Sequence, residues 1–154
     1  MTQRLNLFAA APKALEPLLA IGPTVAASTL EPALVLLVEI RASQINGCAN
    51  CLHMHTADAR KAGEREERIY LLDAWRESSM YTPRERAALA WTEALTLVAQ
   101  THAPDADYEG LKPYFSEEEI VYLTVLITGI NAWNRIAIGF RAQHPNDTKL
   151  RAAA

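Results

Sequence analysis

The chain has 154 residues, half of them apolar, and a formal net charge of −3 at pH 7. This length suits one ordinary domain that buries its own core, and we expect a single domain over residues 1–154. With charges of both signs and no basic patch, the sequence argues against nucleic acid as a partner.

The N-terminal region does not resemble a signal peptide, because charged residues and prolines interrupt its apolar residues at Pro12, Lys13, Glu16 and Pro17. Later, the uninterrupted apolar run 33–38 is far shorter than the roughly 20 residues that span a bilayer. We therefore expect a soluble, cytoplasmic protein without membrane contact. In a reducing compartment, two cysteines spaced as CxxC are more often catalytic or metal-binding than a permanent cross-link.

Helix-forming residues dominate the sequence, and alternating apolar runs bounded by Asn-Gly or Asp-Gly are absent, so we predict an all-α fold. About six to seven helices are expected, over residues 12–20, 30–45, 48–61, 64–75, 83–100, 108–112 and 117–143. The signals that set their bounds are a stop at Gly22-Pro23, a stop at Asn46-Gly47, a stop at Gly63, and capping boxes at Thr82/Glu85 and Ser116/Glu119.

The last predicted helix is apolar on more than one side, apart from polar residues such as Asn131 and Asn134. A helix of this kind is normally buried, and in a short chain this indicates burial between subunits as well as within one. We therefore expect apolar helices that interlock subunits in a homo-oligomer. The asparagines need buried partners, and we expect them to make structural hydrogen bonds.

The only two cysteines lie in the stretch INGCANCLHMHTADARKAG, at the start of the third predicted helix. Positions 48, 51 and 55 are related by i, i+3 and i+7, which places Cys48, Cys51 and His55 on one helix face and turns His53 away. Unpaired N–H groups at a helix start favour a thiolate, and a histidine one turn on can exchange protons with a thiol. This arrangement is suited to cycling between a dithiol and a disulfide.

Three other interpretations of the cysteine pair stay open. A zinc site is one, although the chain lacks the second pair of ligands that usually lies downstream. Two inert, buried cysteines are another. A stable structural disulfide is the third, although so small a loop gains little chain entropy.

The string SQINGCANCLHMHTADARKAG resembles the core of the AhpD-like alkylhydroperoxidase and carboxymuconolactone decarboxylase superfamily, whose peroxidase branch carries INGC-x-x-C-x-x-x-H. The stretches TPRERAALAWTEALTLV and INAWNRIAIGFR are similar to small single-domain members of that branch. Together the resemblance covers a core of residues 30–141. It implies an AhpD-like helical fold, a trimeric or hexameric assembly, and a thiol peroxidase that needs no metal or other cofactor.

The resemblance also implies roles for individual residues. Cys51 matches the peroxidatic cysteine, Cys48 the resolving cysteine and His55 the histidine of a proton relay. The substrate would be hydrogen peroxide or an organic hydroperoxide, and the disulfide would be reduced again by a dithiol partner such as a lipoylated or thioredoxin-like protein.

Two positions depart from the family pattern. The relay glutamate would fall at a position that is Leu36 here, and Glu39 is a candidate substitute one turn closer to the cysteines. The histidine that some members carry between the cysteines is Asn50. Two alternative functions remain: a redox sensor or scaffold that switches without turnover, and an enzyme like carboxymuconolactone decarboxylase, against which the intact cysteine pair argues.

Overall fold

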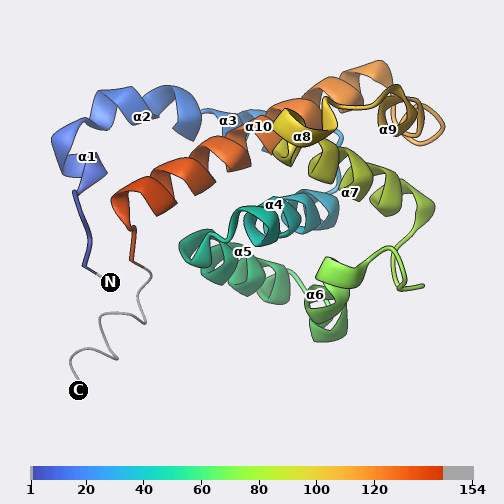
Figure 1. Ribbon diagram of the computed structural model, residues 1–154, viewed down its shortest axis with the longest axis horizontal. Helices are drawn as coiled ribbons and strands as arrows, with labels where there is room; N and C mark the ends of the chain where they lie inside the picture. The colour runs from blue at the N-terminus through green and yellow to red at the C-terminus, as the bar shows by residue number, and fades with distance from the viewer. Residues whose placement is uncertain (1, 144–154) are drawn as a thin grey trace.

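The computed structural model describes residues 2–143, and over these residues the chain is all-α and contains no strand, as predicted (Figure 1). The elements are α1 (Leu7–Ala10), α2 (Pro12–Leu19), α3 (Ile21–Ala26), α4 (Pro32–Asn46), α5 (Ala49–Lys61), α6 (Glu66–Leu71), the 3-10 helix η1 (Leu72–Ala74), α7 (Pro83–Thr96), α8 (Val98–Thr101), α9 (Asp105–Glu109) and α10 (Glu117–Phe140). The part of the expected domain that covers residues 144–154 lies outside the described residues.

The N-terminal region differs from its prediction, because Gly22 and Pro23 do not end a helix but lie inside α3. Pro23 is the third residue of α3, where a helix leaves backbone N–H groups unpaired in any case, so the missing donor costs little. A short helix α1 also precedes the expected one, and the cap of α1 is the Asn6 side chain, which accepts a hydrogen bond from the Ala9 N–H. Residues 4–27 thus form a helical N-terminal arm.

The predicted turn and cap signals in the rest of the chain are confirmed. Gly47 adopts the left-handed conformation (φ +68°) at the end of α4, as a residue without Cβ does at low cost. The capping box of α7 joins Thr82 and Glu85, and that of α10 joins Ser116 and Glu119. These caps depend on neighbours three residues away, which is why sequence alone locates them.

Helix α4 lies at the centre of the molecule, between α10 and α5 in Figure 1, and also contacts α7. Its residues contribute to each of three buried clusters: Leu34 and Val38 pack with α7 and α10, Leu37 and Ile40 pack with α6, η1 and α7, and Ala42 packs with α10 and the cysteines. A helix contacted on all sides must be apolar on nearly all sides, as α4 is.

By length and composition alone, α10 is apolar enough to cross a membrane. Half of its most apolar 18-residue window is buried inside the protein, and core helices of soluble proteins meet the same criterion. This helix is therefore weak evidence for a membrane span.

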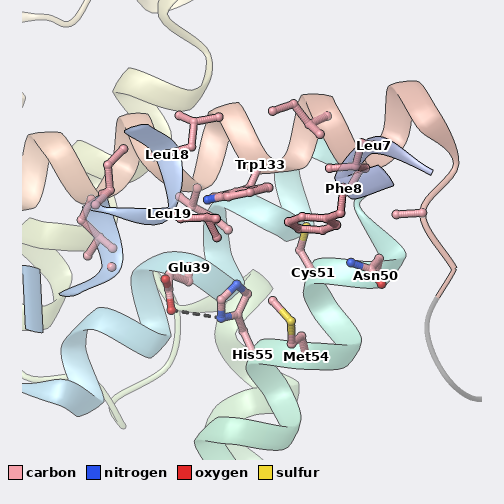
Figure 2. A pocket seen from close by; sticks show the side chains of 18 residues that line it. Leu7, Phe8, Leu18, Leu19, Glu39, Asn50, Cys51, Met54, His55 and Trp133 are labelled. Carbon is pink, nitrogen blue, oxygen red and sulfur yellow. Dashed lines mark ion pairs between the residues drawn. The ribbon is translucent and has the colours of Figure 1, made fainter. Parts of the chain in front are cut away.

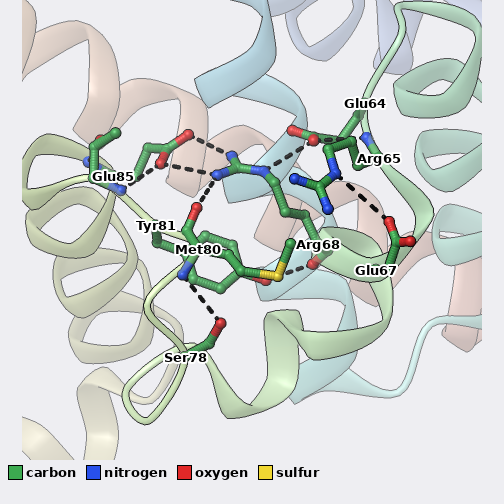
Figure 3. Close-up of polar contacts among 9 residues, drawn as sticks. Glu64, Arg65, Glu67, Arg68, Ser78, Met80, Tyr81 and Glu85 are labelled. Atoms are coloured by element: carbon green, nitrogen blue, oxygen red, sulfur yellow. Dashed lines mark hydrogen bonds and ion pairs between the residues drawn. The ribbon is translucent and has the colours of Figure 1, made fainter.

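A cluster of charged residues surrounds α6, which lies away from α1 and α2 in Figure 1, and Figure 3 shows its contacts. Arg68 of α6 lies between two carboxylates, with its Nε 2.9 Å from Glu64 Oε1 and its Nη2 2.5 Å from Glu85 Oε1. Arg68 also donates to the Met80 carbonyl, and Tyr81 Oη donates to the Arg68 carbonyl. These bonds join α6, the following loop and the start of α7.

Candidate active site

The two cysteines lie at the turn between α4 and α5, and their sulfurs are joined in a disulfide. Gly47 reverses the chain in the left-handed conformation, and Cys48 then acts as the N-cap of α5, one residue earlier than a first-turn position. Its Sγ accepts a hydrogen bond from the Cys51 N–H at 3.4 Å. Cys48 is 1% exposed and Cys51 3% exposed, so reagents reach the sulfurs only through neighbouring cavities.

A buried network of amides fixes this turn against α10. Asn46 Nδ2 donates to Asn131 Oδ1 at 3.0 Å and to Asn134 Oδ1 at 2.9 Å, while Asn134 Nδ2 donates to Ser43 Oγ at 3.0 Å. The prediction of structural hydrogen bonds for the two α10 asparagines is confirmed. Because these bonds hold the end of α4, they also hold the cysteine turn that follows it.

Glu39 on α4 contacts His55 on α5, with Glu39 Oε2 at 3.0 Å from His55 Nδ1 (Figure 2). The two side chains are 21% and 12% exposed. A carboxylate at Nδ1 sets the orientation of the ring and the tautomer that carries its proton there, which leaves Nε2 to accept or donate a proton. This contact unites the histidine and the carboxylate that the sequence singled out.

Cys51, His55 and Glu39 all line one cavity of about 430 Å³, which we call the substrate-side cavity. Figure 2 shows the Cys51 side chain directed into it, with the His55 ring between Glu39 and the open space. The polar side chains of the lining are those three and Asn50. The remainder is apolar and comes from the N-terminal arm, α5, α10 and the residues after it: Leu7, Phe8, Leu18, Leu19, Ile21, Gly22, Met54, Leu126, Gly129, Ile130, Trp133, Ile136, Ala137 and Ala142.

The structure separates the other predicted positions from this group. Leu36 packs against the buried cluster of Leu37, Ile69 and Trp75, one turn away from Glu39. His53 is absent from the lining of the substrate-side cavity as the structure describes it. Among residues 2–143, no group of three or more histidine, cysteine, aspartate or glutamate side chains is placed to hold a metal ion.

Sequence reasoning missed the apolar wall of the cavity. Phe8 lies in a region with no strong helix signal, and Trp133 reads from the sequence as another core residue. Both line the same cavity as Cys51, and only the tertiary packing of α1, α10 and α5 brings them there. Only part of the lining had a local sequence signal: Met54 and His55 follow Cys51 by three and four positions, and so lie on the same face of the helix.

These features define an all-α protein with a dithiol–disulfide site at a helix start, next to a histidine–carboxylate pair and an apolar cavity. The model of the carboxymuconolactone decarboxylase family matches residues 12–94, more than half of the chain. The chain belongs to this family, and so to the superfamily that also includes the AhpD-like proteins.

Two relatives match over nearly their whole length. The chain is 41% identical to the uncharacterized protein YdfG of Bacillus subtilis over 138 residues, which are 90% of this chain and 94% of YdfG. It is 48% identical to ATU0492 of Agrobacterium tumefaciens, a protein of unknown function, with a TM-score of 0.90 over 94% of this chain and 99% of that one.

A more distant structure is that of the debrominase Bmp8, which is 18% identical with a TM-score of 0.76 over 88% of this chain and 73% of Bmp8. At this identity the match shows the fold alone. The fold therefore occurs in proteins of different activity, and the function of this chain must be argued from its own site.

Proposed function

We propose that the protein is a cysteine-dependent peroxidase that reduces hydrogen peroxide or organic hydroperoxides through the Cys48–Cys51 disulfide. The observation that carries this proposal is the position of Cys51. It lies in a disulfide and lines an apolar cavity together with His55, whose ring Glu39 orients. A nucleophile, a proton carrier and an orienting carboxylate in one cavity are the parts that thiol chemistry on a hydroperoxide requires.

The oxidative half-reaction begins from the reduced protein. His55 accepts the Cys51 thiol proton, and the thiolate attacks the hydroperoxide oxygen that is farther from carbon, so that the O–O bond breaks. Cys51 becomes a sulfenic acid, and the alkoxide leaves as an alcohol with a proton from His55. The Cys48 thiol then attacks the Cys51 sulfur, which forms the disulfide and releases water.

The reductive half-reaction returns two electrons from a dithiol. One thiolate of the reductant opens the disulfide to form a mixed disulfide, and its second thiol displaces the protein cysteine and becomes oxidised itself. We propose a lipoylated or thioredoxin-like protein as the class of reductant, in a cytoplasmic setting where such dithiols stay reduced.

Variants of the two cysteines test the assignment of roles. Cys51→Ser should abolish peroxide consumption, while Cys48→Ser should leave a sulfenic acid at position 51 that dimedone labels and mass spectrometry detects. Labelling of position 48 in the Cys51→Ser protein would reverse the two roles. Ala59→Ser, a small change on the same helix at a buried site outside the cavity, serves as the control for folding.

Turnover separates a peroxidase from a redox sensor. With excess dithiothreitol, dihydrolipoamide or thioredoxin, each protein molecule should consume many equivalents of cumene hydroperoxide. Consumption of one equivalent per chain would instead favour a sensor. Full peroxide activity in a protein whose two cysteines are both replaced would refute thiol chemistry altogether and reopen the decarboxylase alternative.

We further propose a homo-oligomer, trimeric or hexameric. Large apolar side chains are exposed on the single chain, among them Val121 at 61%, Phe8 at 54% and Leu19 at 50%. Burial of such residues is the usual source of stability in obligate interfaces. Light scattering coupled to size-exclusion chromatography should give three or six times the mass of 17.0 kDa, and a monomer at micromolar concentration would refute the proposal.

A further inference from the structure

The N-terminal arm is fixed to α10 at two points. At one end, the Arg4 N–H donates to the Phe140 carbonyl at 3.0 Å, and Arg4 Nη1 donates to the Gly139 carbonyl at 2.9 Å. At the other end, Ile21 of α3 packs against Gly129 of α10. Helices α1 and α2 lie in the chain between these two points (Figure 1).

Between its two attachments, the arm supplies an apolar wall of the substrate-side cavity. The lining residues that it contributes are Leu7, Phe8, Leu18, Leu19, Ile21 and Gly22. Phe8 and Leu19 are 54% and 50% exposed, so each has one part on the cavity and another part open to the surroundings. Phe8 also precedes residues 12–94, which the family model matches, so the family match says nothing of what this wall binds.

The substrate-side cavity is polar on one side and apolar on the other. In Figure 2, Glu39 and His55 lie below the cavity, whereas Phe8 and Leu19 of the arm lie above it. A hydroperoxide is divided in the same way, because its O–O–H group forms hydrogen bonds and its organic group does not. With the O–O bond at Cys51 and His55, the organic group is directed at the arm.

Charge distinguishes this cavity from a second one of about 470 Å³, which Cys48 lines together with Arg4 and Arg141. The described lining of the substrate-side cavity has no arginine or lysine, and its one acidic side chain is Glu39. A carboxylate that entered it would lose water without gaining a fixed cation, and would share the cavity with a second carboxylate. The lining therefore favours an organic group without charge.

We propose that Phe8 and Leu19 determine the specificity of the peroxidase, by binding the bulky, uncharged apolar group of an organic hydroperoxide. This inference deepens the proposed function, on which it rests, because it selects among hydrogen peroxide and the organic hydroperoxides. A cavity of about 430 Å³ is within the range that encloses small ligands. Hydrogen peroxide and small alkyl hydroperoxides do not reach the arm and gain no binding energy from it.

A matched pair of substrates measures the contribution of the wall. tert-Butyl hydroperoxide and cumene hydroperoxide have the same tertiary carbon on the O–O group and differ by a methyl against a phenyl group. Cumene hydroperoxide should have a kcat/KM at least about tenfold higher, the factor that about 1.4 kcal/mol of apolar burial gives. Reaction of each hydroperoxide with dithiothreitol alone corrects for intrinsic reactivity. A carboxylate at the para position of cumene hydroperoxide should remove the advantage.

Variants of the arm assign the preference to its residues. Phe8→Ala and, independently, Leu19→Ala should lower kcat/KM for cumene hydroperoxide about three- to tenfold and change that for tert-butyl hydroperoxide less than about twofold. Leu5→Ala removes a side chain of the arm that is 46% exposed and outside the described cavity lining, and should keep the wild-type ratio. Rates are compared at concentrations where light scattering gives the wild-type mass.

Two results of these assays would overturn the inference. One is an equal corrected kcat/KM for the two hydroperoxides in the wild-type protein. The other is a wild-type ratio in both Phe8→Ala and Leu19→Ala, whether the two substrates keep their rates or lose them equally.

A binding measurement separates failure of this inference from failure of the proposed function. 2-Phenylpropan-2-ol, the alcohol that cumene hydroperoxide would yield, carries the same apolar group and does not react with thiols. Its binding, followed by ligand-observed NMR, should weaken about three- to tenfold in Phe8→Ala and stay unchanged in Leu5→Ala. A protein that binds the alcohol in this way without consuming peroxide would keep the apolar site and lose the peroxidase. A protein that consumes both hydroperoxides at equal corrected rates would lose only the present inference.

Discussion

Two clusters of charged side chains in this molecule look alike in their contacts and differ in what surrounds them. Arg68 lies between Glu64 and Glu85, and no residue of that cluster lines either cavity of the described chain. The Glu39–His55 pair is similarly close, but both of its side chains border the open space that Cys51 also faces. A charge that is fully paired and enclosed stabilises the fold, whereas a pair with one face on a cavity can exchange protons with a bound molecule.

The largest expected effect is on activity, at the pair beside the cavity. His55→Gln should lower peroxide consumption about 10²- to 10⁴-fold, because positioned proton transfer contributes an acceleration of this size. Glu39→Gln should lower it about 10- to 100-fold, as loss of an orienting partner does. Steady-state kinetics with cumene hydroperoxide measure both effects.

Stability provides the other half of this test. Denaturant unfolding of His55→Gln and Glu39→Gln should show changes of about 1 kcal/mol or less. Glu31→Gln, which removes an exposed partner of Arg84, is the matched control and should keep wild-type activity. If Glu39→Gln and Glu31→Gln have equal rates, Glu39 does not act in the relay and the two clusters are alike in being structural.

The second effect is on stability, at the enclosed cluster. Arg68→Met should lower the free energy of unfolding by about 3 kcal/mol or more, because it leaves two largely buried carboxylates without their cation. Thermal and urea unfolding measure this loss. Activity per folded molecule should stay at the wild-type level.

The neighbouring residue Arg65 supplies the control for that prediction. Its side chain is 65% exposed and lies 3.6 Å from Glu67, so Arg65→Met should cost less than about 1 kcal/mol. Equal losses for the two substitutions would mean that enclosure of the Arg68 cluster adds nothing.

The third effect concerns the wall of the substrate-side cavity, where α3 of the N-terminal arm approaches α10. A Cβ on Gly129 would lie 2.9 Å from Ile21 Cγ2, so the Ile21 side chain or the helix that carries it would have to shift. Gly129→Ala should therefore cost about 1–3 kcal/mol from crowding, offset by about 1 kcal/mol of helix propensity. It should also alter the relative rates with small and bulky hydroperoxides, since both residues line the cavity.

Gly139 gives the matched control on the same helix. Nothing lies within 4 Å of a Cβ built there, so Gly139→Ala should stabilise the protein by up to about 1 kcal/mol. Ile21→Ala in the Gly129→Ala background should restore part of the loss, as a double-mutant cycle measures. Independent, additive effects of the two substitutions would show that the arm does not contact α10 as described.

Features of the fold and the site that depend on residues close in the sequence could be predicted, and those that depend on tertiary packing could not. The stop at Gly47 and both capping boxes depend on residues a few positions apart, and all of them are found in the structure. Cys51 and His55 line one cavity, as a shared helix face predicts, whereas Cys48 is the N-cap of α5 and lines a different cavity. Glu39 could be proposed as a partner for the site, but its contact with His55 depends on how α4 packs against α5.

The N-terminal arm and the cavity wall could not be predicted in the same way. Gly22-Pro23 is locally a stop signal, and the contact of Ile21 with Gly129 of α10, which supports a helix there, is visible only in the structure. Trp133 likewise differs from the core tryptophans Trp75 and Trp91 only in what faces it. These features come from contacts between residues more than a hundred positions apart, which leave no periodic pattern in the sequence.

The smallest expected effect is the acid sensitivity of folding, which the Arg68 cluster should control. Burial by itself raises the pKa of Glu85, but hydrogen bonds from Arg68 and from the Thr82 N–H outweigh burial and hold that pKa below its ordinary value of 4.5. A carboxyl group with a lower pKa in the folded state binds its proton more weakly there than in the unfolded chain. Its contribution to stability is therefore complete above about pH 4.5 and is lost as the pH falls through the lowered pKa.

The melting temperature of the wild-type protein should accordingly stay level on acidification to about pH 4.5 and then fall. Glu85→Gln should start from a lower melting temperature at neutral pH and fall less steeply, so that the two curves converge in acid. Glu67→Gln, at an exposed position near the same cluster, should remain parallel to the wild type. Parallel curves for Glu85→Gln would mean that this carboxylate gains no stability from Arg68 when it is ionised, and the enclosed cluster would then differ from the cavity pair in location alone.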